Sequence, residues 1–294
     1  MNYAIRYLTS YEYEAEVVDN LNALRVKPAT NGHQRCDEFS VRLSPEVRLH
    51  RHADYFGTEV VEFEVSRPHR QLTIDVRARV CSRPAGDPPA STWDALREPS
   101  YCEAAGEFLL QTDDAPDHPV LHELIRSTRQ AEFPLAAVTQ IAELIPDRFE
   151  YRQGATYVDS RVVDLLDGGA GVCQDFTHLA LCVLRHHGIA ARYVSGYLFA
   201  APSDDGRESV EVETHAWLEA LLPVPGSAEP IWVGADPTNR GLTSQTHVKI
   251  GHGRHYADVP PIKGVYRGVA SATHQARVTM TALEGVDPAS IARS

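Results

Sequence analysis

The chain has 294 residues, of which 43% are hydrophobic and 23% are charged, so its composition is that of a soluble globular protein with a core of normal size. Its formal net charge of −12 argues against a general affinity for nucleic-acid backbones or anionic membranes. Its five cysteines are widely spaced and lack a Cys-x-x-Cys pair, so they indicate neither a disulfide framework nor a zinc site.

The same features predict a location in the cytoplasm. Cysteines that form no framework fit a reducing compartment, and residues 1–8 lack the apolar segment of a signal peptide. The apolar run over residues 179–184 is too short to cross a bilayer. We therefore expect a cytoplasmic protein with no membrane or nucleic-acid partner and no metal or other cofactor. Its oligomeric state is not indicated.

Residues 1 to about 83 predict a domain of β-strands. Over residues 72–80, apolar side chains alternate with polar ones, as in a strand with one buried face. Similar alternation marks residues 3–7, 39–43 and 61–65. Thr9-Ser10 predicts a turn after the first of these strands. Short strands separated by turn signals indicate an antiparallel sandwich or barrel-like domain.

A change in composition predicts the domain boundary. Proline, glycine and aspartate are concentrated toward the two ends of residues 84–119, and a short helix is expected around residues 93–97. We divide the chain into an N-terminal β-sandwich-like domain, residues 1–95, and a core, residues 96–294.

The core is predicted to contain helices followed by strands. Apolar side chains at helical spacing predict helices over residues 120–125 and 134–145, the second ended by Pro146. A third helix begins near Cys173 with a long apolar face, and Gly188 provides the left-handed residue that ends it. Strands are expected over residues 191–199, 210–221 and 231–236.

Cys173 is the strongest candidate for a reactive group. It follows the glycine-rich residues 167–171 and lies in the first turn of a helix, where unpaired backbone N–H groups and the helix dipole favour a thiolate. The thiolate is the nucleophilic form of cysteine. Further along the chain, His215 and Asp236 lie on strand-like segments. Cysteine, histidine and aspartate are the parts of a thiol acyl-transfer site, in which the backbone N–H of the cysteine can stabilise an oxyanion.

The spacing of His215 and Asp236 supports this interpretation. Residues 223–228 carry loop signals, and a hairpin around them pairs Leu222 with Glu229. That register places the histidine directly opposite the aspartate, and directly opposed residues share one face of a sheet. The carboxylate can then accept the imidazole N–H, which fixes the tautomer and leaves the other ring nitrogen for the thiol.

Other candidate residues have simpler interpretations. We interpret the remaining cysteines as packing residues, and several histidines as structural or surface residues, because they fit no common zinc pattern; these are Cys36, Cys81, Cys102, Cys182, His50, His52, His178, His186, His187, His247, His252 and His255. The glycines before Cys173 lack the lysine of a phosphate loop and are expected to let backbone approach a substrate. The predicted substrate-side residues are Gly171, Val172, Gln174 and Trp217, although packing explains the tryptophan equally well.

Four ordered segments resemble the bacterial transglutaminase-like superfamily. They are Gly171-Val-Cys-Gln-Asp-Phe-Thr-His-Leu179, Gly188-Ile-Ala-Ala-Arg-Tyr-Val-Ser-Gly-Tyr197, Thr214-His-Ala-Trp217 and Trp232-Val-Gly-Ala-Asp-Pro-Thr-Asn239. Residues 253–261 resemble the closing element of that family, with His255 where most members have aspartate. Residues 1–83 are similar to the β domain that often precedes the family's core. The resemblance covers nearly the whole chain.

The resemblance implies an α+β fold with a papain-like transglutaminase core, in which a helix bundle packs on an antiparallel sheet, preceded by an antiparallel β domain. It also implies catalytic roles for Cys173, His215 and Asp236. We therefore expect cysteine-dependent acyl transfer on amide bonds of a peptide or protein, through a thioester. An amine takes the acyl group in a transglutaminase, and water takes it in a peptidase or amidase. The alternative is a non-catalytic peptide- or protein-binding module that retains the fold.

Overall fold

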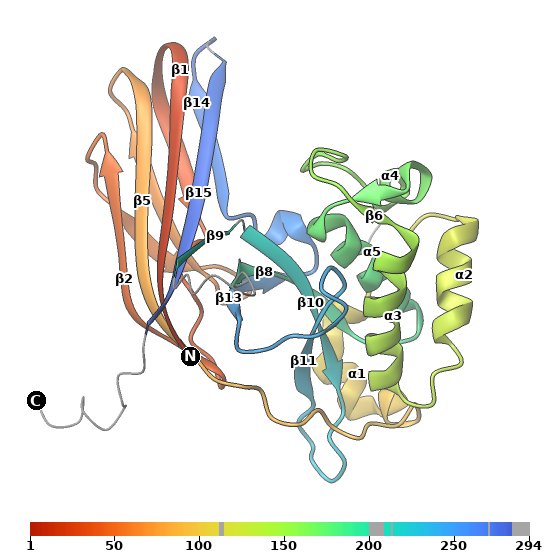
Figure 1. Ribbon diagram of the computed structural model, residues 1–294. Coiled ribbons are helices and arrows are strands. Elements are labelled where there is room, and N and C mark those ends of the chain that lie inside the picture. Colours follow the sequence, from red (N-terminus) through yellow and green to blue (C-terminus); the bar gives the residue numbers. More distant parts are fainter. Residues whose placement is uncertain (112–114, 200–208, 213, 270, 284–294) are drawn as a thin grey trace, which may run out of the picture.

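The computed structural model describes residues 1–111, 115–199, 209–212, 214–269 and 271–283, which form two parts lying side by side (Figure 1). One part is an antiparallel β domain, and the other packs helices against a second sheet. The predicted α+β class with an N-terminal β domain is therefore confirmed. Among these residues, no helix is both long enough and apolar enough to cross a membrane.

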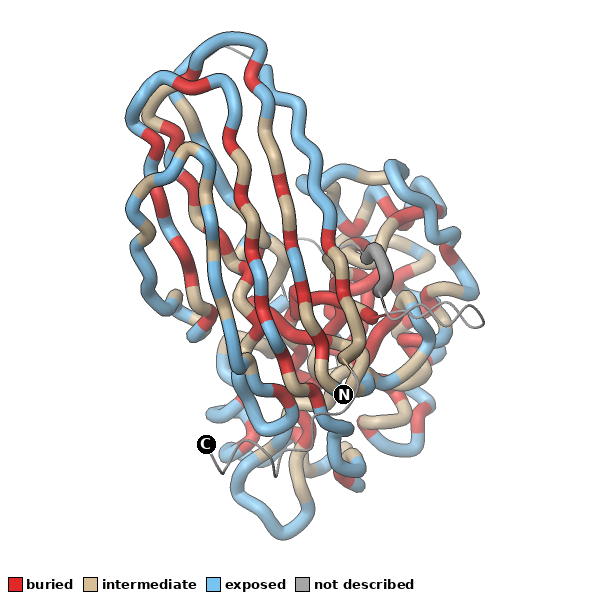
Figure 2. Tube along the Cα trace, turned by 60° about the vertical axis from the view of Figure 1, so that its left-hand side comes forward, coloured by how far each residue is buried: buried red, intermediate tan, exposed pale blue. Residues whose placement is uncertain are grey.

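The β domain is an eight-stranded sheet that folds over through its longest strand. Its strands are β1 (Asn2–Leu24), β2 (Gln34–Ser44), β3 (His50–Ala53), β4 (Glu59–Val65), β5 (His69–Ser82), β9 (Ser209–Val212), β14 (Ile262–Arg267) and β15 (Ala272–Leu283). The first half of β1 pairs with β5 and β15, whereas its end, residues 18–24, pairs with β4 and β14. Alternate residues of the first half, such as Tyr3, Ile5 and Tyr7, are buried in the core of the domain, and this alternation is visible along the long strands (Figure 2).

Strand β1 contains no turn at Thr9-Ser10, so that prediction was wrong. The strand is continuous, and the side chain of Thr9 is completely buried. Its hydroxyl lies 2.8 Å from Nε2 of His274 and donates to the carbonyl of Gln275 at 3.1 Å, both on β15. A neighbouring strand therefore satisfies the hydroxyl group that we had interpreted as a turn signal.

The last strands of the chain belong to the β domain. Both β14 and β15 pair with β1, and β9 pairs with β15, so the predicted assignment of all residues from 96 onward to the core was wrong for these three strands. Pairing with β14 and β15 satisfies backbone groups of β1 that would otherwise form an open sheet edge. Residues 83–94, where the chain first passes between the two parts, contain no helix or strand.

The core packs helices on one side of a five-stranded antiparallel sheet. Its helical elements are η1 (Ala95–Arg97), α1 (Pro99–Ala105), η2 (Gly106–Leu109), α2 (Pro119–Thr128), α3 (Pro134–Arg148), α4 (Val162–Gly168), α5 (Cys173–His186) and η3 (Tyr256–Asp258). Its strands are β6 (Glu150–Tyr151), β7 (Ala170–Gly171), β8 (Ala191–Leu198), β10 (Thr214–Leu222), β11 (Ile231–Asp236), β12 (Gly241–Leu242) and β13 (His247–Gly253). The sheet order is β12-β11-β10-β8-β13, and α5 contacts β8 and β10 with α2 and α3 beside it (Figure 1).

The predicted helices are present, with one boundary moved. The apolar face of α5 is fully buried, and Gly188 follows the helix with a φ of +76°, as predicted. Helix α3 continues past Pro146 to Arg148, so the expectation that the proline ends it was wrong. In the last turn of a helix, a proline removes one hydrogen bond, and the residues after it can still keep helical geometry.

The hairpin of β10 and β11 has a register two residues away from the predicted one. Leu222 pairs with Ile231, so its predicted pairing with Glu229 was wrong. Side chains alternate with a period of two, and a shift of two residues therefore keeps every side chain on its predicted face. As a result, His215 and Asp236 share a face, but they lie diagonally across the hairpin rather than directly opposite each other.

The two domains join at β13. Val248 and Ile250 of this strand pack in the core of the β domain. Between them, the side chain of Gln34 bonds both backbone groups of Lys249: Nε2 donates to the carbonyl at 2.8 Å, and Oε1 accepts from the N–H at 2.8 Å. The N–H of Ala29 donates to the same carbonyl at 2.9 Å. A buried amide therefore takes the place of a neighbouring strand at this point.

Replacing Gln34 with leucine tests this junction. The variant removes both hydrogen bonds to Lys249 and a third from Nε2 to the carbonyl of Ala29, and it leaves a buried N–H without a partner. We therefore expect it to lose about 1–3 kcal/mol of stability. Urea unfolding measures the loss as a lower midpoint. Gln71→Leu, at an exposed position of β5, is the matched control and should unfold almost like the wild type. Equal midpoints for the two variants would contradict a stabilising role for the Gln34 contact.

Candidate active site

Cys173 is the first residue of α5 and faces a cleft of about 400 Å³. Val172 precedes it with an extended backbone and begins the helix. The first N–H groups of a helix have no acceptor within the helix, so the backbone N–H of Cys173 is available to an oxygen atom bound in the cleft. Aromatic and apolar side chains form much of the wall, among them Tyr151, Val158, Tyr193, Tyr256 and Pro261.

His215 connects the thiol to a carboxylate. Its Nε2 lies 2.7 Å from Oδ2 of Asp236, and its ring also hydrogen-bonds Cys173. Because Nε2 faces the carboxylate, Nδ1 is the nitrogen that remains for the thiol. Burial by itself lowers the pKa of His215, but the hydrogen bonds to Asp236 and Cys173, together with their charges, raise it to about 10. The site therefore favours the protonated ring at neutral pH.

Asp236 is 1% exposed and accepts five hydrogen bonds. Its Oδ1 accepts from the backbone N–H groups of Thr238 and Asn239 at 2.9 and 3.2 Å. Its Oδ2 accepts from Nδ2 of Asn239 at 2.7 Å, and from the rings of His215 and His247 at 2.7 and 3.0 Å. Burial alone would raise the pKa of Asp236, but these donors hold it well below its usual range. The carboxylate thus caps a turn and orients a histidine at the same time.

The sequence interpretation missed His247. We expected a surface residue, but its side chain is only 8% exposed. Its Nδ1 accepts from the N–H of Ser244 at 3.2 Å, so Nε2 carries the proton that faces Asp236. No spacing rule links this strand position to the aspartate, and the contact depends on β11 and β13 lying in one sheet.

Trp217 supports the histidines and does not line the cleft, so its predicted place beside a substrate was wrong. Its side chain is 2% exposed, and the indole lies against the rings of His215 and His247, with centroids 6.1 and 5.3 Å away. Gly196 on β8 makes room for it, because a Cβ at that position would lie 2.3 Å from the indole.

His215, Asp236 and His247 are also close enough together to be candidate metal ligands. One ligand atom from each of His215, Asp236 and His247 lies within 4.8 Å of the others. Both Nε2 atoms, however, face the same carboxylate oxygen, which also accepts from Asn239. A metal ion would need the lone pairs of nitrogens that carry protons in this arrangement. The donor set therefore fits a hydrogen-bonded carboxylate better than a metal ion.

The loop between β6 and α4 is tied to the start of α5. Oδ2 of Asp175 accepts from the N–H of Val172 at 2.8 Å and from the hydroxyl of Thr156 at 2.6 Å. The side-chain amide of Gln174 donates to the carbonyl of Val158 at 3.0 Å. Of the predicted substrate-side residues, Val172 and Gln174 do line the cleft, and the glutamine also holds its rim.

The glycines before Cys173 serve packing and do not line the cleft. A Cβ on Gly171 would lie 2.8 Å from Oδ2 of Asp175 and 2.9 Å from Leu165, so a larger residue there would displace these side chains. Gly169 ends α4 with a φ of +70°. Because neither glycine is among the residues that line the cleft, the expectation that they admit a substrate backbone was wrong.

Both parts of the chain match known protein families. Residues 3–81 match the family of the bacterial transglutaminase-like N-terminal region, and residues 122–237 match the transglutaminase-like superfamily. An uncharacterised protein of Mycobacterium leprae is 33% identical over 277 residues, which cover 94% of this chain and 96% of that protein. A protein-glutamine gamma-glutamyltransferase of Pseudomonas aeruginosa is 27% identical over 154 residues, which cover 50% of this chain and 22% of that protein.

A solved structure has the same fold. It is a protein of Cytophaga hutchinsonii, described as a candidate cysteine protease, and it superimposes with a TM-score of 0.77 at 21% sequence identity. The match covers 97% of this chain and 91% of that one, so it includes both the β domain and the core.

The raised pKa of His215 predicts how stability changes with pH. The pKa rises from 6.5 to about 10 on folding, so the folded state favours the protonated ring. That contribution is complete below pH 6.5 and is lost as the pH rises toward 10. We expect the wild type to have a higher unfolding free energy than His215→Gln. This difference, the margin, should be largest near pH 6 and should shrink toward pH 10.

Urea unfolding at several pH values measures this margin. His186→Gln, at an exposed position of α5, is the control and should show a margin that changes little with pH. A margin for His215→Gln that stays constant or grows between pH 6 and pH 10 would contradict an ion pair between protonated His215 and Asp236.

Proposed function

Because this chain belongs to the transglutaminase-like superfamily, we propose that it is an enzyme that takes acyl groups from amide bonds through a thioester on Cys173. The observation that carries the proposal is the position of one imidazole ring. His215 bonds both the thiol at the start of α5 and the buried carboxylate of Asp236. Nucleophile, proton carrier and orienting group are therefore connected before any substrate binds.

The first half of the reaction forms the thioester. The sulfur of Cys173 attacks the carbonyl carbon of the amide, and the carbonyl oxygen becomes an oxyanion. The proton on Nδ1 of His215 passes to the leaving nitrogen, the C–N bond breaks, and an amine or ammonia departs. Throughout, Asp236 accepts the other ring N–H, which holds the ring in place and stabilises its positive charge.

The backbone N–H of Cys173 is the donor that we assign to the oxyanion. It points out of the end of α5, where the positive end of the helix dipole also lies. A donor fixed in place before the reaction stabilises charge as it develops and needs no reorganisation.

The second half transfers the acyl group. An amine or a water molecule attacks the thioester carbon and gives a proton to Nδ1 of His215. The C–S bond then breaks, which releases the sulfur of Cys173 beside the protonated ring. The Pseudomonas relative is named as a protein-glutamine gamma-glutamyltransferase, and the Cytophaga structure is described as a candidate cysteine protease. Both outcomes use the same thioester, so an experiment has to distinguish them.

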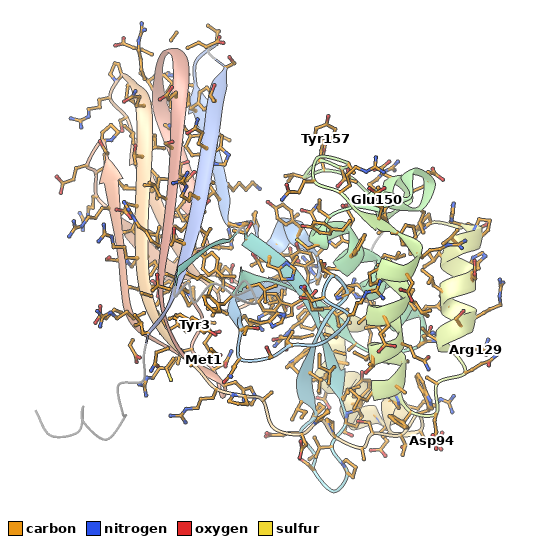
Figure 3. The ribbon with its side chains drawn as sticks, viewed as in Figure 1. Met1, Tyr3, Asp94, Arg129, Glu150 and Tyr157 are labelled. Atoms are coloured by element: carbon orange, nitrogen blue, oxygen red, sulfur yellow. The ribbon has the colours of Figure 1, made fainter. Side chains whose placement is uncertain are left out.

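The cleft walls support a peptide or protein as the substrate. Tyr151, Tyr193 and Tyr256 present rings to the cleft, beside the apolar surfaces of Val158 and Pro261. Rings and apolar side chains of this kind bind an extended peptide segment. On the same rim, Tyr157 projects outward and is 79% exposed, where a large substrate can reach it (Figure 3).

Alkylation with iodoacetamide tests the reactivity of the thiol. We expect Cys173 to react before Cys102, although Cys102 is exposed, because Cys173 has a histidine partner and is the first residue of its helix, whereas Cys102 lies inside α1. Peptide mapping after brief labelling at neutral pH measures the ratio, and first labelling at Cys102 would refute the assignment.

Substitution of the three residues tests catalysis. Cys173→Ala should keep the fold and lose all turnover of a peptide amide substrate, whereas Cys182→Ala on the same helix should keep turnover. Asp236→Asn should slow turnover on the order of 10⁴-fold, by analogy with the serine protease triad. Mass spectrometry of products formed with and without a primary amine distinguishes amine transfer from hydrolysis. Equal turnover by Cys173→Ala and the wild type would favour the binding-module alternative.

A further inference from the structure

A second cavity lies between the two domains. Its volume is about 880 Å³, which is within the range of small-molecule sites. The β domain contributes residues 29–33, 56–58 and 84–88 to its wall, and the core contributes parts of β8, β10, β11 and β13. It shares no lining residue with the cleft at Cys173, so it is a separate site.

Charged side chains that are mostly buried line the core side of this cavity. Arg192, Glu219 and Lys249 are only 12%, 15% and 10% exposed. Both cations bond the same carboxylate oxygen: Nε of Arg192 donates to Oε2 of Glu219 at 2.6 Å, and Nζ of Lys249 donates to it as well. One acidic group therefore faces two basic groups.

His252 does not correct this imbalance. Its Nε2 accepts from Nη1 of Arg192 at 3.0 Å. Burial and the charges of Lys249 and Arg192 lower the pKa of His252 to about 3, so the ring is neutral. The other titratable residues of the wall, His33 and Asp87, are exposed at the mouth. The buried part of the wall therefore carries one net positive charge.

A buried positive charge without a counter-ion is unfavourable. The titration of Lys249 reflects this, because burial lowers its pKa to about 8, with Glu219 acting against the shift and Arg192 adding to it. A carboxylate entering the cavity would supply the missing negative charge. A guanidinium group and an ammonium group in one wall suit an anion with two oxygen atoms.

Apolar and aromatic side chains line another part of the wall, which also includes hydroxyl and amide side chains. The guanidinium carbon of Arg192 lies 3.8 Å from the centre of the Trp232 ring. Phe56 and Ile250 line the same space. A ligand that fits this lining has a carboxylate at one end and an apolar or aromatic body.

We propose that this interdomain cavity binds a carboxylate attached to an apolar or aromatic group, with Arg192 and Lys249 as its charge partners. A free aromatic acid and the C-terminus of a peptide share this chemistry. Because the cavity wall comes from both domains, such a ligand bridges them. The proposal does not depend on the chemistry at Cys173.

Calorimetric titration of the full-length Cys173→Ala variant tests the proposal, since this variant cannot consume an amide. The probes are phenylacetate and the peptide Gly-Gly-Phe with a free C-terminus, each compared with its amide. We expect at least one acid to bind at least about tenfold more tightly than its amide. The acid that binds more tightly identifies the source. If neither acid binds, or if acids and amides bind equally, the proposal is wrong.

Two variants locate the site. Lys249→Met should remove the preference for acid over amide, whereas Lys263→Met, at an exposed lysine, should leave it unchanged. Leu242→Glu places a negative charge at the cavity wall, at a residue that is 38% exposed, and should weaken acid binding severalfold even if Lys249→Met does not fold. Unchanged acid binding in Leu242→Glu would place the ligand elsewhere and overturn the proposal.

Discussion

The geometry of the proposed active site depends on one buried carboxylate. An ionised Asp236 is tolerated in the interior only because donors surround it. Those donors come from the turn after β11, from His215 on β10 and from His247 on β13, so the carboxylate connects three strands of the sheet. Moving any one of these strands would leave a buried charge with fewer partners. The sheet therefore holds the histidine, without help from a substrate, in the orientation that the proposed mechanism needs.

The two faces of that sheet have different tasks. One face packs against α5, which brings Cys173 to the cleft. The other carries His215, Trp217 and Glu219 on alternate positions of β10, and around Glu219 it faces the β domain. Gln34 of that domain bonds the backbone of Lys249 on β13, the strand that also carries His247. The β domain therefore supports the same strand that helps to hold Asp236.

Local patterns predicted what depends on neighbours in sequence, and they missed what depends on neighbours in space. The helix start at Cys173 and the shared face of His215 and Asp236 follow from caps and alternation, and even a register error of two residues preserved that face. The role of His247 follows from strand order, which no local pattern reports. The return of residues 262–283 to β1 was missed for the same reason, since alternation predicts a strand but not its partner.

The closing wall of the cleft shows how the domains act together. The segment that carries Tyr256 and Pro261 is held from both sides. The N–H of Tyr256 donates to Nε2 of His178 on α5 at 3.2 Å. The carbonyl of Pro261 accepts from the backbone N–H of Arg25 in the β domain at 2.8 Å. Burial lowers the pKa of His178 to about 4, so its ring stays neutral and keeps the lone pair that this contact needs. A core separated from the β domain would keep Cys173 but would lose one of the two anchors of its cleft wall.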